Sequence, residues 1–130
     1  MILLDTHVWV WWVQADPRLT ASQQGHIAAH GATGLGVSVI SCWEVGLLEA
    51  AGRITLPLPV GDWVRAALAY TGVRLLDLTP EVAVDSTRPP APFHRDPADR
   101  ILVATPRALA IPILTADARI LAYSHVRTLT

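Results

Sequence analysis

Ile2-Leu3-Leu4-Asp5-Thr6 opens the chain with three apolar residues that end at an acid and a threonine. A short apolar run of this kind indicates a buried strand, and the polar pair after it indicates the start of a helix. The next stretch, residues 7–14, is apolar on nearly every side and predicts that helix. The chain therefore begins with a strand and a helix, and an acidic residue stands between them.

The same alternation of strand and helix continues through the 130 residues. We predict strands at residues 2–4, 37–40, 73–78, 111–114 and 126–129. We predict helices at residues 7–14, 20–29, 41–51, 63–70, 81–85, 99–110 and 117–123, and a proline-rich loop at residues 88–97. Alternation of this kind favours parallel pairing, so the expected fold class is α/β, a three-layer α/β/α sandwich. No linker divides the chain, and we expect residues 1–130 to form a single domain.

The composition excludes several classes of protein. The chain is 52% hydrophobic and 16% charged, has a net charge of −1 and contains no lysine. A phosphate-binding loop that ends in Gly-Lys, a Schiff-base lysine and a kinase-type lysine are therefore impossible. The single cysteine, Cys42, excludes a disulfide scaffold and a cysteine-based zinc site. The nearly neutral charge argues against a protein that coats nucleic acid by charge alone.

Two features of the apolar residues concern location and partners. The longest apolar run, residues 8–13, is too short to cross a membrane, and the N-terminus has no basic segment. We therefore expect a cytoplasmic protein without a membrane partner. High apolar content in so short a chain also suggests that a partner covers some of its surface.

Acidic residues follow the predicted strands. Asp5 ends the first strand, Glu44 lies about one turn beyond the second, and Asp117 follows the fourth, while Asp96 and Asp99 open the helix before that strand. Ligands of parallel α/β sheets bind at the carboxyl ends of the strands. Clustered carboxylates raise one another's pKa unless a cation neutralises them. Oxygen ligands without cysteine point to Mg²⁺ or Mn²⁺.

Helix capping is the alternative explanation for these acids. Ser41-x-x-Glu44 fits a capping box, Asp96 precedes a proline at a helix start, and Asp117 can cap a short helix. Asp5 is less easily explained in this way, because Thr6 is available as the cap. Capping accounts for one acid at each helix start, but it does not explain why one edge collects five of the eleven acidic residues.

Four blocks of sequence, taken together and in order, resemble the motifs of PIN-domain ribonucleases, specifically the VapC-type toxins of bacterial toxin–antitoxin pairs. The resemblance covers essentially the whole chain. The blocks are Leu3-Leu4-Asp5-Thr6-His7-Val8, Ser41-x-Trp43-Glu44, His94-Arg95-Asp96-Pro97-Ala98-Asp99-Arg100-Ile101-Leu102-Val103-Ala104 and Leu114-Thr115-Ala116-Asp117. The resemblance implies a Rossmann-like parallel sheet of order 3-2-1-4-5 with an acidic pocket that holds a divalent metal.

The resemblance also implies roles for particular residues. Asp5, Glu44 and Asp117 match the first, second and fourth acids of the family, and Asp99 is favoured over Asp96 as the third. Asp96 is then an outer ligand or a cap. These acids would hold Mg²⁺ or Mn²⁺ for the hydrolysis of RNA such as tRNA or rRNA, leaving a 5′-phosphate and a 3′-hydroxyl. The residues that would orient the carboxylates are Thr6 and Thr115.

Partner contacts are expected from the basic and aromatic residues. Arg95 and Arg100 are candidates for contact with RNA phosphates, with a surface salt bridge as the alternative. The resemblance implies a homodimer and a VapB-type antitoxin, in a heterotetramer or a larger complex. Candidates for these interfaces, for which core packing is the alternative, are Trp9, Trp11, Trp12 and Trp43. His7 and His94 flank two of the acids, but metal-activated hydrolysis requires no histidine.

One departure and several rival classes remain. Pro106 lies inside a predicted helix, where the family usually has a helix former, and should distort that helix locally.

Phosphoacceptor receiver domains have a similar α/β sheet, but that family needs a lysine, and this chain has none. Haloacid-dehalogenase-like phosphatases need a second aspartate two positions after the first, where this chain has His7. A catalytically inert PIN-fold module that binds proteins, and a metal-dependent phosphatase-like α/β domain, stay as alternatives.

Overall fold

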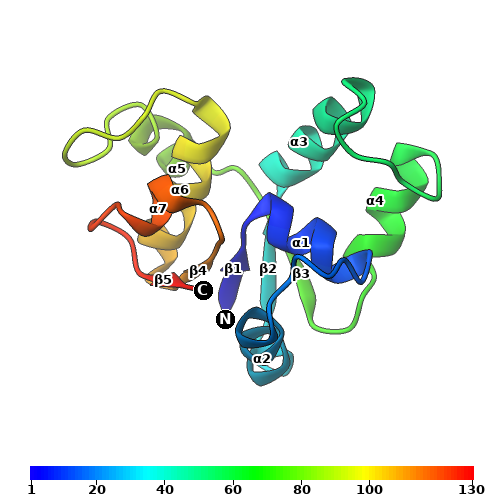
Figure 1. Ribbon diagram of the computed structural model, residues 1–130. Coiled ribbons are helices and arrows are strands. Elements are labelled where there is room, and N and C mark those ends of the chain that lie inside the picture. The colour runs from blue at the N-terminus through cyan, green and yellow to red at the C-terminus, as the bar shows by residue number, and fades with distance from the viewer.

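Five strands form one parallel sheet in the order β3-β2-β1-β4-β5. Figure 1 shows the computed structural model, which describes residues 1–130, with helices on both sides of this sheet. The strands are β1 (Ile2–Leu4), β2 (Leu35–Ser38), β3 (Val73–Leu76), β4 (Ile113–Leu114) and β5 (Thr128–Leu129). This topology confirms the predicted α/β class and the strand order.

Seven helices connect the strands. Two precede β2, two lie between β2 and β3, and two lie between β3 and β4, while one short helix separates β4 from β5. They are α1 (Thr6–Val13), α2 (Ala21–His30), α3 (Val39–Ala50), α4 (Val60–Leu68), α5 (Pro80–Asp85), α6 (Pro97–Leu109) and α7 (Ala118–Leu121). None of them combines the length and the apolar character that crossing a bilayer requires.

The core has two parts because successive residues of a strand face opposite sides of a sheet. Ile2 and Leu4 of β1 pack in a cluster with apolar residues of α1, α2, α3 and α4. Leu3, between them, packs in a second cluster with residues of α6 and α7. All three side chains are fully buried. The central strand therefore holds the two helical layers together, as the opening apolar run predicts.

The second strand begins and ends earlier than its β-branched residues predict. We expected a strand at residues 37–40, but β2 ends at Ser38, and Val39 and Ile40 already belong to α3. The reason is a cap, since the Ser38 side chain accepts a hydrogen bond of 3.1 Å from the Ile40 backbone N–H. Ser41 consequently lies inside α3, and the capping box predicted between Ser41 and Glu44 does not form.

Proline positions explain two further differences. α6 begins at Pro97 instead of residue 99, because proline is preorganised for the first helical position and Asp96 caps the helix. Pro106 lies inside α6 and removes a helical N–H donor, yet the helix continues past it to Leu109. The distortion expected at Pro106 therefore does not end the helix.

Candidate active site

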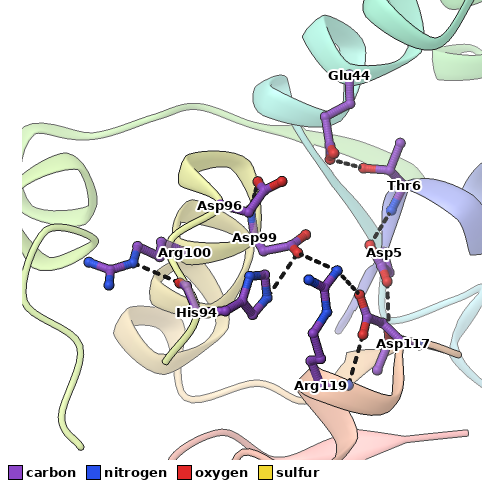
Figure 2. A network of polar contacts seen from close by, with 10 residues as sticks. Asp5, Thr6, Glu44, His94, Asp96, Asp99, Arg100, Asp117 and Arg119 are labelled. Atoms are coloured by element: carbon purple, nitrogen blue, oxygen red, sulfur yellow. Dashed lines mark hydrogen bonds and ion pairs between the residues drawn. The ribbon is translucent and has the colours of Figure 1, made fainter. Parts of the chain in front are cut away.

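The five predicted acids line one cavity of about 370 Å³ at the carboxyl ends of the central strands. The five carboxyl groups that line it come from widely separated positions in the sequence. The residues that line it are Asp5, His7, Val10, Trp11, Arg18, Glu44, Leu48, Arg53, Ile54, Asp96, Asp99, Asp117 and Arg119. Figure 2 shows the polar contacts among the acids and their neighbours.

Asp5 has both carboxylate oxygens in short hydrogen bonds. Its Oδ1 accepts from the Thr6 backbone N–H at 2.7 Å, and its Oδ2 accepts from the Thr115 hydroxyl at 2.6 Å. Asp5 itself therefore caps α1, and Thr6 is the first helical residue and not the cap we expected. Burial raises the pKa of Asp5, although the Thr115 hydrogen bond opposes that rise. A bound cation would therefore stabilise the ionised form of Asp5.

Thr115 connects two of the acids. Its hydroxyl donates to Asp5 and accepts a hydrogen bond of 3.0 Å from the backbone N–H of Asp117. Thr115 is fully buried, so neither contact competes with water. The hydroxyl thus orients the Asp5 carboxylate and holds the start of the segment that carries Asp117.

Thr6 connects α1 with α3. Its hydroxyl donates to Glu44 Oε1 at 2.6 Å and lies 2.8 Å from the Ser41 hydroxyl. Because the single proton of Thr6 goes to Glu44, Ser41 must be the donor in the second contact. Burial raises the pKa of Glu44, and the hydrogen bond from Thr6 partly offsets that rise. Thr6 and Thr115 therefore hold one carboxylate each, as the resemblance implies.

Asp99 is the acid with the most perturbed pKa. Burial, followed by the negative charges of Asp96 and other nearby acids, raises the pKa of Asp99 from its ordinary 3.8 to about 7. Its Oδ2 lies 3.1 Å from His94 Nε2, without the alignment of a hydrogen bond. Burial and the nearby Arg119 lower the pKa of His94, so the imidazole offers little positive charge. Asp99 is thus surrounded by carboxylates, and the imidazole nearest to it does little to neutralise its charge.

Arg119 supplies a positive charge inside the acidic cluster. Its Nη2 lies 3.7 Å from Asp99 Oδ2 and 3.5 Å from Asp117 Oδ2, and Figure 2 shows the guanidinium between these two side chains. The Asp117 carboxylate also accepts from the Arg119 backbone N–H at 2.8 Å and so caps α7. A cation of the protein itself thus contacts two carboxylates that were predicted to hold a metal.

Asp96 and the arginines beside it have different surroundings. Asp96 caps α6 by accepting from the Asp99 backbone N–H at 3.1 Å, as the capping interpretation predicts, and it also lines the cavity. Arg100 donates from Nε and Nη2 to the backbone carbonyls of His94 and Phe93, at 2.9 and 3.1 Å, so it holds the loop before α6. Arg95 is exposed and lies outside the cavity lining.

The fit of a metal ion depends on two observations. The donor set fits a hard divalent cation, because it consists of carboxylates and already contacts a guanidinium that serves as a positive stand-in. As the side chains stand, however, no three Asp, Glu, His or Cys residues converge closely enough to hold an ion. The chemistry of the pocket therefore suits Mg²⁺ or Mn²⁺, and a bound ion would require the carboxylates to close around it.

The four tryptophans predicted at interfaces separate into two groups. Trp9 is completely buried and packs edge-on against Trp63 with ring centroids 5.2 Å apart, so it is a core residue and cannot contact a partner. This outcome corrects the prediction for Trp9. Trp11 and Trp12 are half-buried, and Trp43 is 54% exposed.

Three charged residues of the cavity escaped the sequence analysis, and all three are arginines. Arg18 follows α1, Arg53 follows α3 and Arg119 lies in α7. Arg119 could have been noticed, because it stands two residues after an acid that was already singled out. Arg18 and Arg53 carry no local signal, since only the packing of α1 beside α3 brings them to the same cavity.

The chain is similar in sequence to a known family of proteins. Residues 2–126 match the model of the PIN domain. Ribonuclease VapC22 of Mycobacterium tuberculosis is 34% identical over 129 residues, which cover 99% of this chain and 96% of that protein.

Solved structures share the fold over nearly the whole chain. VapBC2 from Rickettsia felis, bound to a DNA fragment from its promoter, has a TM-score of 0.71 at 11% identity and covers 98% of this chain and 97% of its own. FitAcB from Neisseria gonorrhoeae has a TM-score of 0.70 at 18% identity, with 100% and 97% covered. At such low identities the agreement concerns the architecture of the chain.

Proposed function

Since this chain belongs to the PIN domain family, we propose that it is a metal-dependent ribonuclease. The observation that carries the proposal is that five carboxyl groups line one cavity at the carboxyl edge of the sheet. The similarity to a protein named as a ribonuclease supports RNA as the substrate class. Within that class we propose structured RNA such as tRNA or rRNA.

We assign the metal to Asp5, Asp99 and Asp117, with Glu44 and Asp96 at its margin. When bound, Mg²⁺ or Mn²⁺ supplies an activated water and stabilises charge on the phosphate. The remaining contributions come from the chain itself. Thr115 and Thr6 hold the Asp5 and Glu44 carboxylates in place through bonds of 2.6 Å each. Such preorganisation lowers the cost of assembling the site around the substrate.

Arg119 has a place in this proposal as an internal counter-ion. Its guanidinium contacts Asp99 and Asp117 at 3.7 and 3.5 Å, and its side chain is 62% exposed. Because it is exposed, Arg119 would be free to turn away if a divalent ion neutralised these acids in its place. Its guanidinium donors would then be available to an RNA phosphate beside the site.

The test of the ribonuclease proposal is the cleavage of total RNA by the purified chain. We expect cleavage with Mg²⁺ or Mn²⁺, loss of cleavage with a chelator, and loss in an Asp5→Asn variant. Asp85→Asn is the matched control, because Asp85 is exposed at the end of α5 and lies outside the cavity. Equal cleavage by the wild type and Asp5→Asn would show that the activity does not come from this site.

We further propose that the chain is the toxin of a toxin–antitoxin pair and forms a homodimer that binds a VapB-type antitoxin. The names VapC22 and VapBC2 of the similar proteins support this role, because they match the VapC-type toxins that the sequence motifs resemble. Expression alone should arrest growth, and a pull-down should recover a small protein encoded next to this chain. The absence of both effects would contradict the toxin role without affecting the proposed nuclease activity.

A catalytically inert PIN-fold module that binds proteins is the second candidate. The observation that favours it is the lack of three converging metal ligands. Calorimetric titration with Mn²⁺ separates the two candidates. Binding that disappears in Asp5→Asn supports the nuclease, whereas a wild type that binds no Mn²⁺ supports the inert module.

A further inference from the structure

One wall of the acidic cavity carries an aromatic ring and positive charge instead of carboxylates. Trp11 of α1 and Arg18, in the loop that follows α1, both line the cavity. The Arg18 guanidinium carbon lies 5.3 Å from the centroid of the Trp11 ring. Arg53 lines the same cavity and takes part in no ion pair. We call Trp11 and Arg18 the stacking wall.

Arg18 is held in a defined orientation by Asp16. The Asp16 carboxylate accepts from Arg18 Nη2 at 2.8 Å and from its Nε at 3.2 Å, and it also accepts from the Arg18 backbone N–H at 2.9 Å. Two parallel contacts of this kind fix the plane of a guanidinium. Nη1 remains as the side-chain donor group without a partner in the protein. The stacking wall, which lines the cavity, therefore contains a fixed planar cation with one free donor group.

Stability does not explain this arrangement. The Arg18 side chain is 68% exposed, and ion pairs in water add little to the stability of a fold. Arg65 and Asp62 on α4 form a comparable exposed pair at 2.8 Å, but they lie outside the cavity. What distinguishes Arg18 is its position over an indole, beside the carboxylates that we assign to phosphodiester hydrolysis.

We propose that the stacking wall is a nucleotide subsite, where Arg18 over Trp11 binds an unpaired base of the RNA next to the phosphate that is cleaved. This inference rests on the proposed ribonuclease function. A nucleobase stacks on the open side of the guanidinium, which is itself supported by the indole. Nη1 of Arg18 and the unpaired Arg53 then contact the phosphates that flank this base.

The chemistry of the wall favours a single-stranded nucleic acid over an acidic peptide. A carboxylate would need only the charge of Arg18, whereas a base also needs the flat surface that the Trp11 ring supports. Every base has an aromatic face, so the subsite is expected to tolerate different sequences. It binds only a base that is not stacked in a duplex, and it therefore directs the acidic cluster towards loops and unpaired ends.

Fluorescence anisotropy with a labelled single-stranded RNA tests this inference, with Ca²⁺ present in place of Mg²⁺ to occupy the acidic site. We expect Trp11→Ala and Arg18→Ala each to weaken RNA binding about tenfold, which is within the range for the loss of one stacked base. Trp11→Phe should retain most of the affinity. An abasic ribose-phosphate strand of equal length should bind the wild type weakly and lose little more affinity in Trp11→Ala.

The matched controls are Arg65→Ala and Trp12→Ala, which should bind RNA as the wild type does. Arg65 has the same kind of exposed aspartate partner, and the Trp12 ring packs against Tyr70, away from the cavity. Arg18 is exposed, so Arg18→Ala tests the subsite even if Trp11→Ala fails to fold. Unchanged RNA affinity in Arg18→Ala, or in a folded Trp11→Ala, would overturn the proposal. Equal losses for RNA and the abasic strand would also overturn it and would indicate a site for anions alone.

The subsite and the ribonuclease activity can fail independently. If the wild type cleaves RNA and the stacking-wall variants bind RNA normally, only the subsite is contradicted. If RNA binding follows the expected pattern but the wild type does not cleave RNA, the nuclease proposal is contradicted and the subsite is not.

Discussion

The Thr115 hydroxyl has two partners in a fully buried position. It donates to Asp5 at 2.6 Å and accepts from the Asp117 backbone N–H at 3.0 Å. Removing a buried partner leaves the other groups unsatisfied, which costs about 1 to 3 kcal/mol. Because both contacts belong to acids of the cavity, Thr115 links the stability of the fold with the geometry of the site.

We predict that Thr115→Val lowers the free energy of unfolding by about 1 to 3 kcal/mol and weakens Mn²⁺ binding. Urea unfolding and calorimetric titration measure the two effects. Thr105→Val is the matched control, because Thr105 is buried in α6 and its hydroxyl donates only to the Ile101 carbonyl. A Thr115→Val variant that binds Mn²⁺ as tightly as Thr105→Val would exclude the orienting role of Thr115.

The perturbed Asp99 predicts how the stability of the metal-free protein changes with pH. Its pKa is about 7 in the folded state, so the folded protein retains a proton that the unfolded chain releases near pH 4. Stability therefore falls as pH rises from about 4 to about 7 and then levels off. Asp99→Asn should weaken this fall and leave the variant more stable than the wild type at pH 8. Urea unfolding in chelator across this range is the measurement, and parallel curves for the two proteins would contradict it.

At the scale of the elements, helix starts and carboxylate positions coincide. Asp5, Asp96 and Asp117 each cap a helix with one oxygen, and all three line the cavity. Capping and metal binding are therefore not exclusive roles, because a carboxylate can cap a helix and still lie at the carboxyl edge of the sheet. The helices that begin at this edge therefore bring the acids to it.

The end of α6 provides a test of local backbone strain. Ala110 follows the helix with φ of 54° and ψ of 42°, in the left-handed region that glycine adopts without a steric penalty. We predict that Ala110→Gly raises the free energy of unfolding by about 1 kcal/mol. Ala108→Gly, at an exposed helical position of α6, should lower it by about 0.5 to 1 kcal/mol. Equal effects of the two changes in chemical unfolding would contradict the assignment of strain to Ala110.

At the scale of the whole molecule, the charge is divided between one cavity and the remaining surface. Five of the eleven acids and three of the ten arginines line the cavity, so seven arginines and six acids remain elsewhere. With a divalent ion bound, the protein presents a mildly basic surface to RNA despite its net charge of −1. The overall composition therefore hides the feature that matters for an anionic substrate.

We predict that divalent ions stabilise the folded chain, with a gain of about 2.7 kcal/mol at a Mn²⁺ concentration one hundred times the dissociation constant. The gain should be larger at pH 8 than at pH 5, because Asp99 must lose its proton to bind an ion. Thermal unfolding with and without Mn²⁺ at the two pH values measures this difference. Asp5→Asn is the variant that should lose the gain, and Asp85→Asn should keep it.

Local sequence patterns are enough to predict the alternation of strands and helices and the edge of the sheet at which the acids gather. The apolar run of β1 and the acids after β1 and β4 are local signals, because strand burial and helix starts depend on neighbouring residues. Which residue caps a helix is harder to predict from the sequence. Asp5 and Thr6 are adjacent, and only the packing of Thr6 against Glu44, 38 positions away, shows which of them is the cap.

Long-range packing determines which other side chains surround the acids. Trp9 and Trp11 stand two positions apart in one apolar helix, yet Trp9 faces the core and Trp11 faces the cavity. Arg18 and Arg119 enter the cavity from loops and helices that are far apart in the sequence. Hydrophobic periodicity specifies which side of an element is buried, but it does not specify which elements meet. The positive charge beside the carboxylates therefore depends on long-range packing that no local pattern encodes.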